Sequence, residues 1–305
     1  MKRTIINAHT HLVDLEGMLM KYGNVGLPGG IAVLHDLEPT LRLLQPNILI
    51  DQMDEAGVSK SVLFAVEAPL VYSSNEYVAA ICTRFPDRFI GFASVDPRDK
   101  SAAKTLEHAV RNLGLQGLKL HPPLQQFFPN SEAVFSVYEK AIELNIPVVF
   151  HVGTTPFGSL CRLAHANPVL IDDVAVRFPA LRIMLTHLGT LWHLEAFMVV
   201  EKNPNVFIDT AAYLYEIPQI LTTDLITRVG ADRIVFGTDY PMPYSDRAHR
   251  IKDFVDVVDC LAISDAHKRA FYYENFERFL YGTEAPAQVS IGLQELLVRA
   301  RDAVL

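Results

Sequence analysis

The sequence predicts an α/β fold, specifically a (β/α)8 TIM barrel with additional C-terminal helices. Short, near-continuous apolar runs recur along the chain and alternate with segments of helical pattern. Such runs are typical of parallel strands that are covered on both faces. Eight of them fall within 305 residues, which favours a closed barrel over its alternative, an open doubly wound sheet.

The predicted strands are separated by regular intervals after an irregular beginning. The first strand lies in the run 4–12, and the segment at about 12–45 is glycine-rich and predicted to be a long functional loop. The later strands are predicted at 61–66, 89–95, 117–121, 147–151, 181–187, 205–209 and 233–239.

Helices are predicted between these strands, near 46–57, 74–85, 101–113, 131–145, 167–178, 190–202 and 217–229. Gly57 is expected to end the first helix, and Ser101 and Ser131 are placed to cap later ones. The barrel is expected to span about 4–282, with a C-terminal helical extension at 283–305. Since no linker or low-complexity tract interrupts the chain, residues 1–305 are predicted to form a single domain.

Composition narrows the class of partner. The net charge is −8, from 27 basic and 35 acidic residues without a dense run of either sign, which argues against nucleic acid or an anionic membrane as a partner. The three scattered cysteines are typical of reduced thiols. No secretion signal and no membrane span are visible. We therefore expect a cytoplasmic protein that acts on a small molecule.

Metal-ligating residue types stand at the ends of several predicted strands. His9 and His11 alternate along the first strand, so their side chains project on the same side. His151, His187 and Asp239 end later strands, and the carboxyl ends of barrel strands form the floor of the active site. Any single histidine could be a hydrogen-bonded core residue. As a set, however, His9, His11, His151 and Asp239 suit Zn²⁺ or a related divalent ion.

These stretches resemble the amidohydrolase superfamily, within it the amidohydrolase-related branch that contains aminocarboxymuconate-semialdehyde decarboxylase. The resemblance spans residues 4–282. The matching stretches are Asn7–His11, Gly117–Pro122, Val149–His151, Thr186–Gly189, Phe236–Pro241 and Asn275–Leu280.

The resemblance implies that His9, His11, His151 and Asp239 bind one divalent ion. Zn²⁺ is expected, although Mn²⁺, Co²⁺ and Fe²⁺ accept the same ligands. His187 and Asp239 are the implied catalytic residues, with His187 as the base or acid that handles the proton of metal-bound water. A homodimer is the assembly that members of this branch suggest.

Lys119 admits two interpretations. Binuclear members of the superfamily carry on their fourth strand a carbamylated lysine that bridges two metals, but a second metal is not the favoured reading here. The alternative is an unmodified cation that pairs with a buried acid or with a substrate carboxylate.

Five further polar residues are weighed for the same end of the barrel. Arg162, Arg247 and Tyr213 lie in loops after strands and are candidates for binding a substrate carboxylate. His121 is expected to cap its strand rather than face the pocket. Asp209 is expected to orient a ligand histidine.

The predicted function is that of a metal-dependent hydrolase, which uses metal-activated water on a small amide, ester or lactone of a carboxylic acid. The alternative is a non-oxidative, metal-dependent decarboxylase of a small aromatic or unsaturated acid. The same ligands serve both reactions, so fold and site alone do not decide between them. A metal-binding barrel without turnover is the non-enzymatic alternative.

Overall fold

The protein is described by a computed structural model. It places residues 3–25, 41–155, 157–211, 213–241, 243–244, 247–248 and 250–282. The predicted extension at 283–305 and a large part of the predicted loop at 12–45 lie outside these residues.

Strands β1 to β8 are parallel and pair in the order of the sequence. β1 to β3 form one group and β4 to β8 the other. Their bounds are β1 Ile6–Thr10, β2 Lys60–Phe64, β3 Phe89–Phe92, β4 Leu118–Leu120, β5 Val148–Phe150, β6 Ile183–Leu185, β7 Val206–Asp209 and β8 Ile234–Val235.

Backbone hydrogen bonds join the two groups at both seams. Between β3 and β4, the amide of Lys119 donates to the carbonyl of Ala93 at 2.7 Å. Between β1 and the end of β8, the amide of Ala8 donates to the carbonyl of Phe236 at 2.9 Å. The strands therefore complete a ring, and the predicted (β/α)8 barrel is confirmed.

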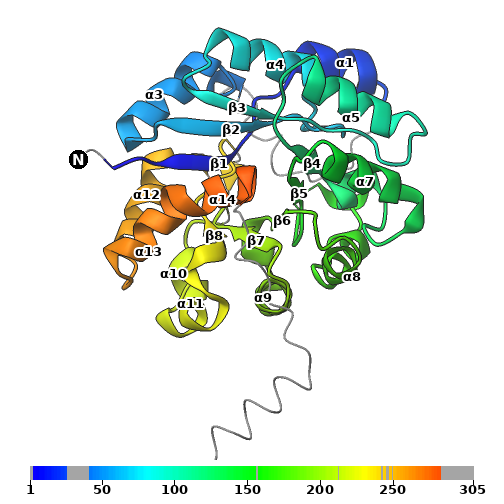
Figure 1. The fold of residues 1–305 in the computed structure, drawn as a ribbon. Coiled ribbons are helices and arrows are strands. Elements are labelled where there is room, and N and C mark those ends of the chain that lie inside the picture. Colours follow the sequence, from blue (N-terminus) through cyan, green and yellow to red (C-terminus); the bar gives the residue numbers. More distant parts are fainter. Residues whose placement is uncertain are drawn as a thin grey trace, which may run out of the picture.

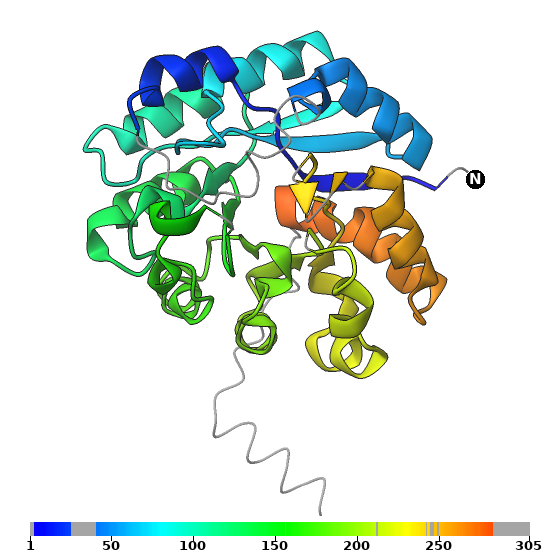
Figure 2. The same cartoon turned by 180° about the vertical axis from the view of Figure 1, so that it is seen from behind.

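Helices surround the strands on the outside of the ring (Figure 1 and Figure 2). They are α3 Pro46–Ala56, α4 Asn75–Arg84, α5 Ala102–Arg111, α7 Phe135–Glu143, α8 Val169–Arg177, α9 His193–Lys202, α10 Ile217–Ile220, α11 Thr223–Val229 and α12 Ile251–Cys260. Gly57 ends α3 in the left-handed region at φ 70°, as predicted. Ser101 occupies its cap position without a side-chain cap bond, and so does Ser131, at a short 3-10 turn.

Two predicted segments differ from the structure. The segment at 12–45 contains a helix, α1 Leu15–Tyr22, which begins where Asp14 accepts a hydrogen bond from the Gly17 amide. The single helix predicted at 217–229 is two helices, because Thr222 caps a new start by accepting from the Leu225 amide.

Alternate residues of the strands build two apolar layers. The cluster inside the ring contains Ile6, Ala8, Val62, Phe64, Ile90, Phe92, Val149, Met184, Phe207 and Val235. The larger cluster between ring and helices takes the opposite parity, as Leu118 and Leu120 of β4 show. This alternation turns Lys119, between those two leucines, into the ring.

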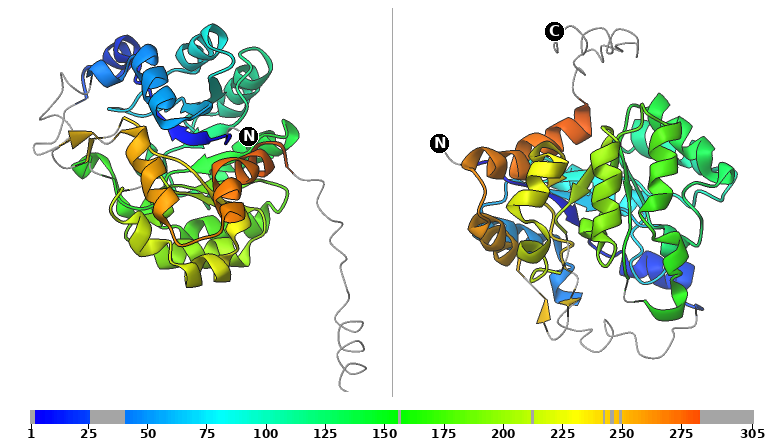
Figure 3. Two further views of the ribbon diagram at one scale, coloured as in Figure 1. Left: turned by 90° about the vertical axis from the view of Figure 1, so that its left-hand side faces the viewer. Right: turned by 90° about the horizontal axis from the view of Figure 1, so that it is seen from below.

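The C-terminal helices close one end of the barrel. After α12 come α13 Asp265–Arg269, a π-helical turn Ala270–Glu274 and α14 Asn275–Tyr281, which lie beside the entering N-terminal strand (Figure 3). The side-chain Nδ2 of Asn275 donates to the carbonyls of Ala231 and Ile234, each at 2.7 Å, near the start of β8. Phe276 and Phe279 of α14 join the inner cluster. The carboxyl ends of the strands are therefore left to form the site.

Candidate metal centre

Three donor atoms converge at the carboxyl ends of β1 and β8. His9 Nε2 lies 3.1 Å from His11 Nε2, and Asp239 Oδ1 lies 3.1 Å from the first and 3.2 Å from the second. For metal–ligand bonds of about 2.1 Å, neighbouring donors in a tetrahedral or octahedral shell lie roughly 3.0–3.4 Å apart. The spacing of the three atoms therefore fits one face of a metal coordination shell.

Asp209, the last residue of β7, orients His9. Its Oδ2 lies 2.7 Å from His9 Nδ1, and both side chains are fully buried. Since the carboxylate accepts the Nδ1 proton, a neutral His9 presents a bare Nε2 to the donor cluster. This is the contact to a histidine that the sequence predicted for Asp209, and it is typical of the residues that hold metal-ligating histidines.

The backbone adopts unusual conformations where it carries these groups. Asp239 has φ 60° and His187 has φ 61°, both in the left-handed region that favours glycine. The Asp239 amide donates to the His9 carbonyl at 2.9 Å, and the His187 amide donates to Asp209 Oδ1 at 2.7 Å. Such strain gathers at functional sites, where the surrounding contacts hold it in place.

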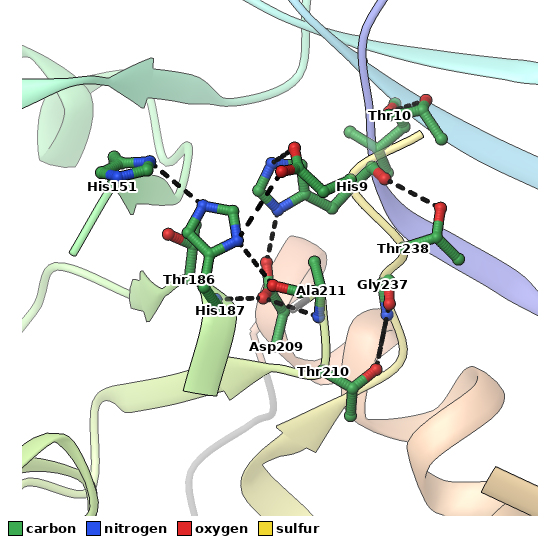
Figure 4. Close-up of polar contacts among 12 residues, drawn as sticks. His9, Thr10, His151, Thr186, His187, Asp209, Thr210, Ala211, Gly237 and Thr238 are labelled. Atoms are coloured by element: carbon green, nitrogen blue, oxygen red, sulfur yellow. Dashed lines mark hydrogen bonds and ion pairs between the residues drawn. The ribbon is translucent and has the colours of Figure 1, made fainter. Parts of the chain in front are cut away.

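His187 stands between His9 and His151 (Figure 4). Its Nδ1 lies 2.5 Å from the Ala211 carbonyl, which can only accept. A neutral His187 therefore carries no proton on Nε2. This nitrogen lies 3.0 Å from His151 Nδ1 and accepts a hydrogen bond from it. His151 is left with a bare Nε2 that is buried and has no hydrogen-bond partner among the described residues.

The predicted four-residue ligand set is thus brought together only in part. His9, His11 and Asp239 form one potential metal-binding group, and His9, His187 and Asp209 form another. His151 belongs to neither group, and its role as a ligand stays a prediction. Its unpartnered Nε2 is the nitrogen that would accept from a positively charged or hydrogen-bond-donating group.

Burial and the local charges shift the pKa values of the site. Burial lowers the pKa of His11 to about 4 and that of His187 to about 4, and it lowers the pKa of His151 well below the ordinary range. Burial alone would raise the pKa of Asp239, but the charges of His9 and His187 and the contacts with both ligand histidines hold it well below its usual value. Burial and the charge of Lys119 would lower the pKa of His9, but Asp209 and Asp239 raise it. The site therefore offers an ionised carboxylate and, at His11, His151 and His187, neutral imidazoles, which are the forms in which these groups bind metal.

His121 combines capping with contact to the site. It caps the short helix α6 Pro122–Gln125, where its Nδ1 accepts from the Leu124 amide at 3.3 Å. Its ring stacks on that of His151, with centroids 3.9 Å apart and planes at 12°. His121 was predicted to cap its strand and not to face the site, whereas it caps a helix and stacks on a site histidine.

Lys119 lies beside the cluster. Its side chain is 1% exposed, and its Nζ lies 4.9 Å from the centroid of the Phe64 ring. The same ring packs edge to face against His9 and His11. Burial lowers the pKa of Lys119 to about 8, against the raising effect of Asp209 and Asp239.

The three other candidates for substrate binding differ in how near the structure places them to the donor cluster. Tyr213 is half-buried, and burial raises its pKa with contributions from Glu216 and Asp239, which puts it near the cluster. Arg162 is exposed in the loop after β5. Arg247 begins the short strand β10 Arg247–Ala248, which pairs with β9 Pro243–Tyr244, but its side chain lies outside the described part.

Sequence reasoning missed two contributors to the site. Phe64, the last residue of β2, packs against His9 and His11. The Ala211 carbonyl fixes the tautomer of His187. The position of Phe64 at a strand end was the available signal. A backbone carbonyl carries no signal in the sequence.

Fold and site together define a (β/α)8-barrel enzyme with a metal-binding cluster of histidine and aspartate. The family model described as Amidohydrolase matches residues 6–282, and the chain belongs to this family. The resemblance drawn from the strand-end motifs is thereby confirmed.

Relatives and solved structures are similar to this chain over most of its length, and the solved structures share its fold. γ-Resorcylate decarboxylase of Polaromonas sp. (strain JS666 / ATCC BAA-500) is 25% identical, over 73% of this chain and 83% of that protein. An uncharacterised TIM-barrel protein from Bordetella bronchiseptica superposes with a TM-score of 0.71 at 22% identity, covering 92% and 99% of the two chains. A 5-carboxyvanillate decarboxylase from Novosphingobium aromaticivorans, solved with manganese and 4-hydroxy-3-methoxy-5-nitrobenzoic acid, gives 0.65 at 18% identity, covering 91% and 95%.

Within the described part of the chain, no helix has the length and apolar character needed to cross a membrane.

Proposed function

We propose that the protein is a metal-dependent, non-oxidative decarboxylase of a small aromatic or unsaturated acid. The triangle of His9, His11 and Asp239 donors, with His187 beside it, is the observation that supports metal-dependent chemistry. The decarboxylase activity of named relatives supports carboxy-lyase chemistry over the hydrolysis that was the first prediction.

The reaction breaks the bond between the carboxylate and a ring or vinyl carbon, releases CO₂ and adds a proton to that carbon. A bound divalent ion would supply positive charge that withdraws electrons from the oxygens of the substrate. His9, His11 and Asp239 would hold this ion, with His151 proposed as the fourth ligand.

His187 is the proposed proton carrier. Its Nε2 carries no proton in the neutral ring. Once this nitrogen releases the hydrogen bond from His151 Nδ1, it can take the proton of an acidic substrate hydroxyl and return it to the carbon that loses CO₂. No proton is gained or lost in this transfer, and the electron pair of the broken bond forms the new C–H bond. The Ala211 carbonyl holds the ring so that Nε2 is always the working nitrogen.

One divalent ion per chain is proposed. Zn²⁺ was predicted from the ligand types, and the manganese in the carboxyvanillate decarboxylase makes Mn²⁺ the second ion to test.

The test is an assay for CO₂ release by protein loaded with Zn²⁺ or with Mn²⁺. The panel contains 2,6-dihydroxybenzoate, 5-carboxyvanillate and other hydroxybenzoates, next to aryl esters, lactones and amides. We expect CO₂ from at least one acid, and a loss of roughly 10²- to 10⁴-fold in kcat for His187→Gln, which lacks the proton carrier. The metal content of this variant serves as the control, since it should match that of the wild type.

The proposal is wrong if the metal-loaded protein hydrolyses an ester, lactone or amide and releases no CO₂ from any acid. That result would restore the hydrolase prediction.

A further inference from the structure

Lys119 is a buried cation without a hydrogen-bond partner. Its side chain is 1% exposed, and Nζ has no partner among the described residues. Its Nζ lies over the face of the Phe64 ring, 4.9 Å from the centroid. A cation–π contact of this kind recovers only part of what an ammonium group loses when it leaves water.

The two carboxylates that the charge of Lys119 reaches are engaged elsewhere. Asp209 accepts from His9 Nδ1 and from the amides of His187 and Ala211. Asp239 Oδ1 lies between His9 and His11. Lys119 therefore acts on both acids only through space.

A count of formal charges shows what the site lacks. Asp209 and Asp239 contribute −2, a divalent ion in the proposed site would contribute +2, and Lys119 contributes +1. With neutral imidazoles the sum is +1. One negative charge on a bound molecule would make the site neutral, and it would also give the ammonium a hydrogen-bond acceptor.

We propose that Lys119 determines specificity for anionic substrates, because its ammonium binds the carboxylate of a small organic acid next to the donor cluster. The inference rests on the proposed function and extends it to the residue that recognises the substrate. Packing on the face of Phe64 favours the unmodified ammonium over a carbamylated lysine, which would carry a negative charge toward the ring.

The first test measures binding without turnover. Metal-loaded wild type, Lys119→Met and Lys119→Arg are titrated with benzoate and with benzamide, which has the same shape without the charge. We expect Lys119→Met to bind benzoate about 10- to 100-fold more weakly, as when a charged hydrogen bond is lost. Benzamide binding should not change, and Lys119→Arg should recover a large part of the benzoate affinity.

The second test separates binding from chemistry. The charge of the carboxylate disappears as CO₂ forms, so its contact with Lys119 is not strengthened in the transition state. With the acid found by the CO₂ assay, Lys119→Met should raise KM while kcat does not fall.

Equal benzoate affinity in wild type and Lys119→Met overturns the inference. So does a content of two metal ions per wild-type chain that falls to one in Lys119→Met, which would identify Lys119 as a bridging ligand. Benzoate binding requires no turnover, so failure of the proposed reaction leaves the first test intact. If Lys119→Met does not fold, the affinities of Lys119→Arg and wild type for benzoate and for benzamide still test the inference.

Discussion

At the scale of single residues, Asp209 ties the candidate centre together. Its two oxygens accept from His9 Nδ1 and from the amides of His187 and Ala211. One buried carboxylate thus sets the tautomer of His9, a proposed metal ligand, and the backbone position of His187, the proposed proton carrier.

Asp209→Asn should weaken metal binding by about 10- to 100-fold, because the amide is a poorer acceptor for the His9 proton. Chelator competition with the purified variant measures this change. Asp224→Asn, an exposed substitution in α11, is the matched control. Unchanged affinity in Asp209→Asn would show that His9 does not depend on this contact.

Acid should destabilise the metal-free protein through the same cluster. Burial lowers the pKa values of His11 and His187 to about 4, whereas histidines in an unfolded chain titrate near about 6.5. Between these values the unfolded state binds more protons, so stability falls as pH drops, by about 1.4 kcal/mol per pH unit for each histidine. Urea unfolding of chelator-treated protein across this window measures the slope.

His187→Gln should show a shallower slope, since it removes one of the titrating groups. A stability that is flat between pH 6.5 and 4 in the wild type would contradict the depressed pKa values.

The sequence predicted which residues would lie at the site, but it predicted less about the geometry in which they meet. Strand ends are legible in the apolar runs, so His9, His11, His187 and Asp239 could be assigned to one end of a barrel. That His187 would stand between His9 and His151 was not readable, because it depends on a left-handed backbone at His187 and on side-chain rotamers that only the packed barrel determines.

At the scale of elements, strand β4 begins against a close neighbour. A Cβ built on Gly117 would lie 2.3 Å from the Phe92 ring, which is part of the inner cluster. Only a residue without a side chain lets β4 enter the ring at this point.

Gly117→Ala should therefore destabilise the protein by about 1–3 kcal/mol through overpacking, measured by urea unfolding. Adding Phe92→Leu should recover part of the loss, because the two sites share one space. Gly57→Ala is the comparison, since its φ of 70° is strained for alanine but its Cβ meets open space. A Gly117→Ala variant as stable as wild type would mean that the Phe92 ring can move aside.

Elements with a regular local pattern could be predicted from the sequence. Elements that depend on contacts distant in sequence could not. The helix α1 was missed because contacts distant in sequence hold it, as when Lys21 and Tyr22 both reach Glu67 at 2.6 Å. The helix at 217–229 was predicted as one because its apolar period continues across the Thr222 cap.

At the scale of the whole molecule, the donor cluster joins the first strand of the barrel to the last. His9 and His11 come from β1, and Asp239 follows β8. A metal bound there would hold together the seam at which the ring closes, so metal binding and barrel stability are coupled.

Adding the metal at about 100 times its dissociation constant should raise the free energy of unfolding by roughly 2.7 kcal/mol, and a chelator should reverse the gain. Thermal unfolding with and without metal measures the effect. His11→Asn, which replaces the imidazole nitrogen with a weaker amide oxygen, should respond much less. If the midpoint of thermal unfolding of the wild type does not change when metal is added, the cluster holds no ion.

The closing seam also has a consequence for biosynthesis. The first strand leaves the ribosome before its barrel partner, because more than two hundred residues separate His11 from Asp239. At about 5–20 residues per second, the two histidines of that strand wait on the order of ten seconds or longer for the aspartate that completes the donor triangle. The donor triangle can therefore form only after Asp239 has left the ribosome, and until then the nascent chain carries an open strand edge that is prone to aggregation.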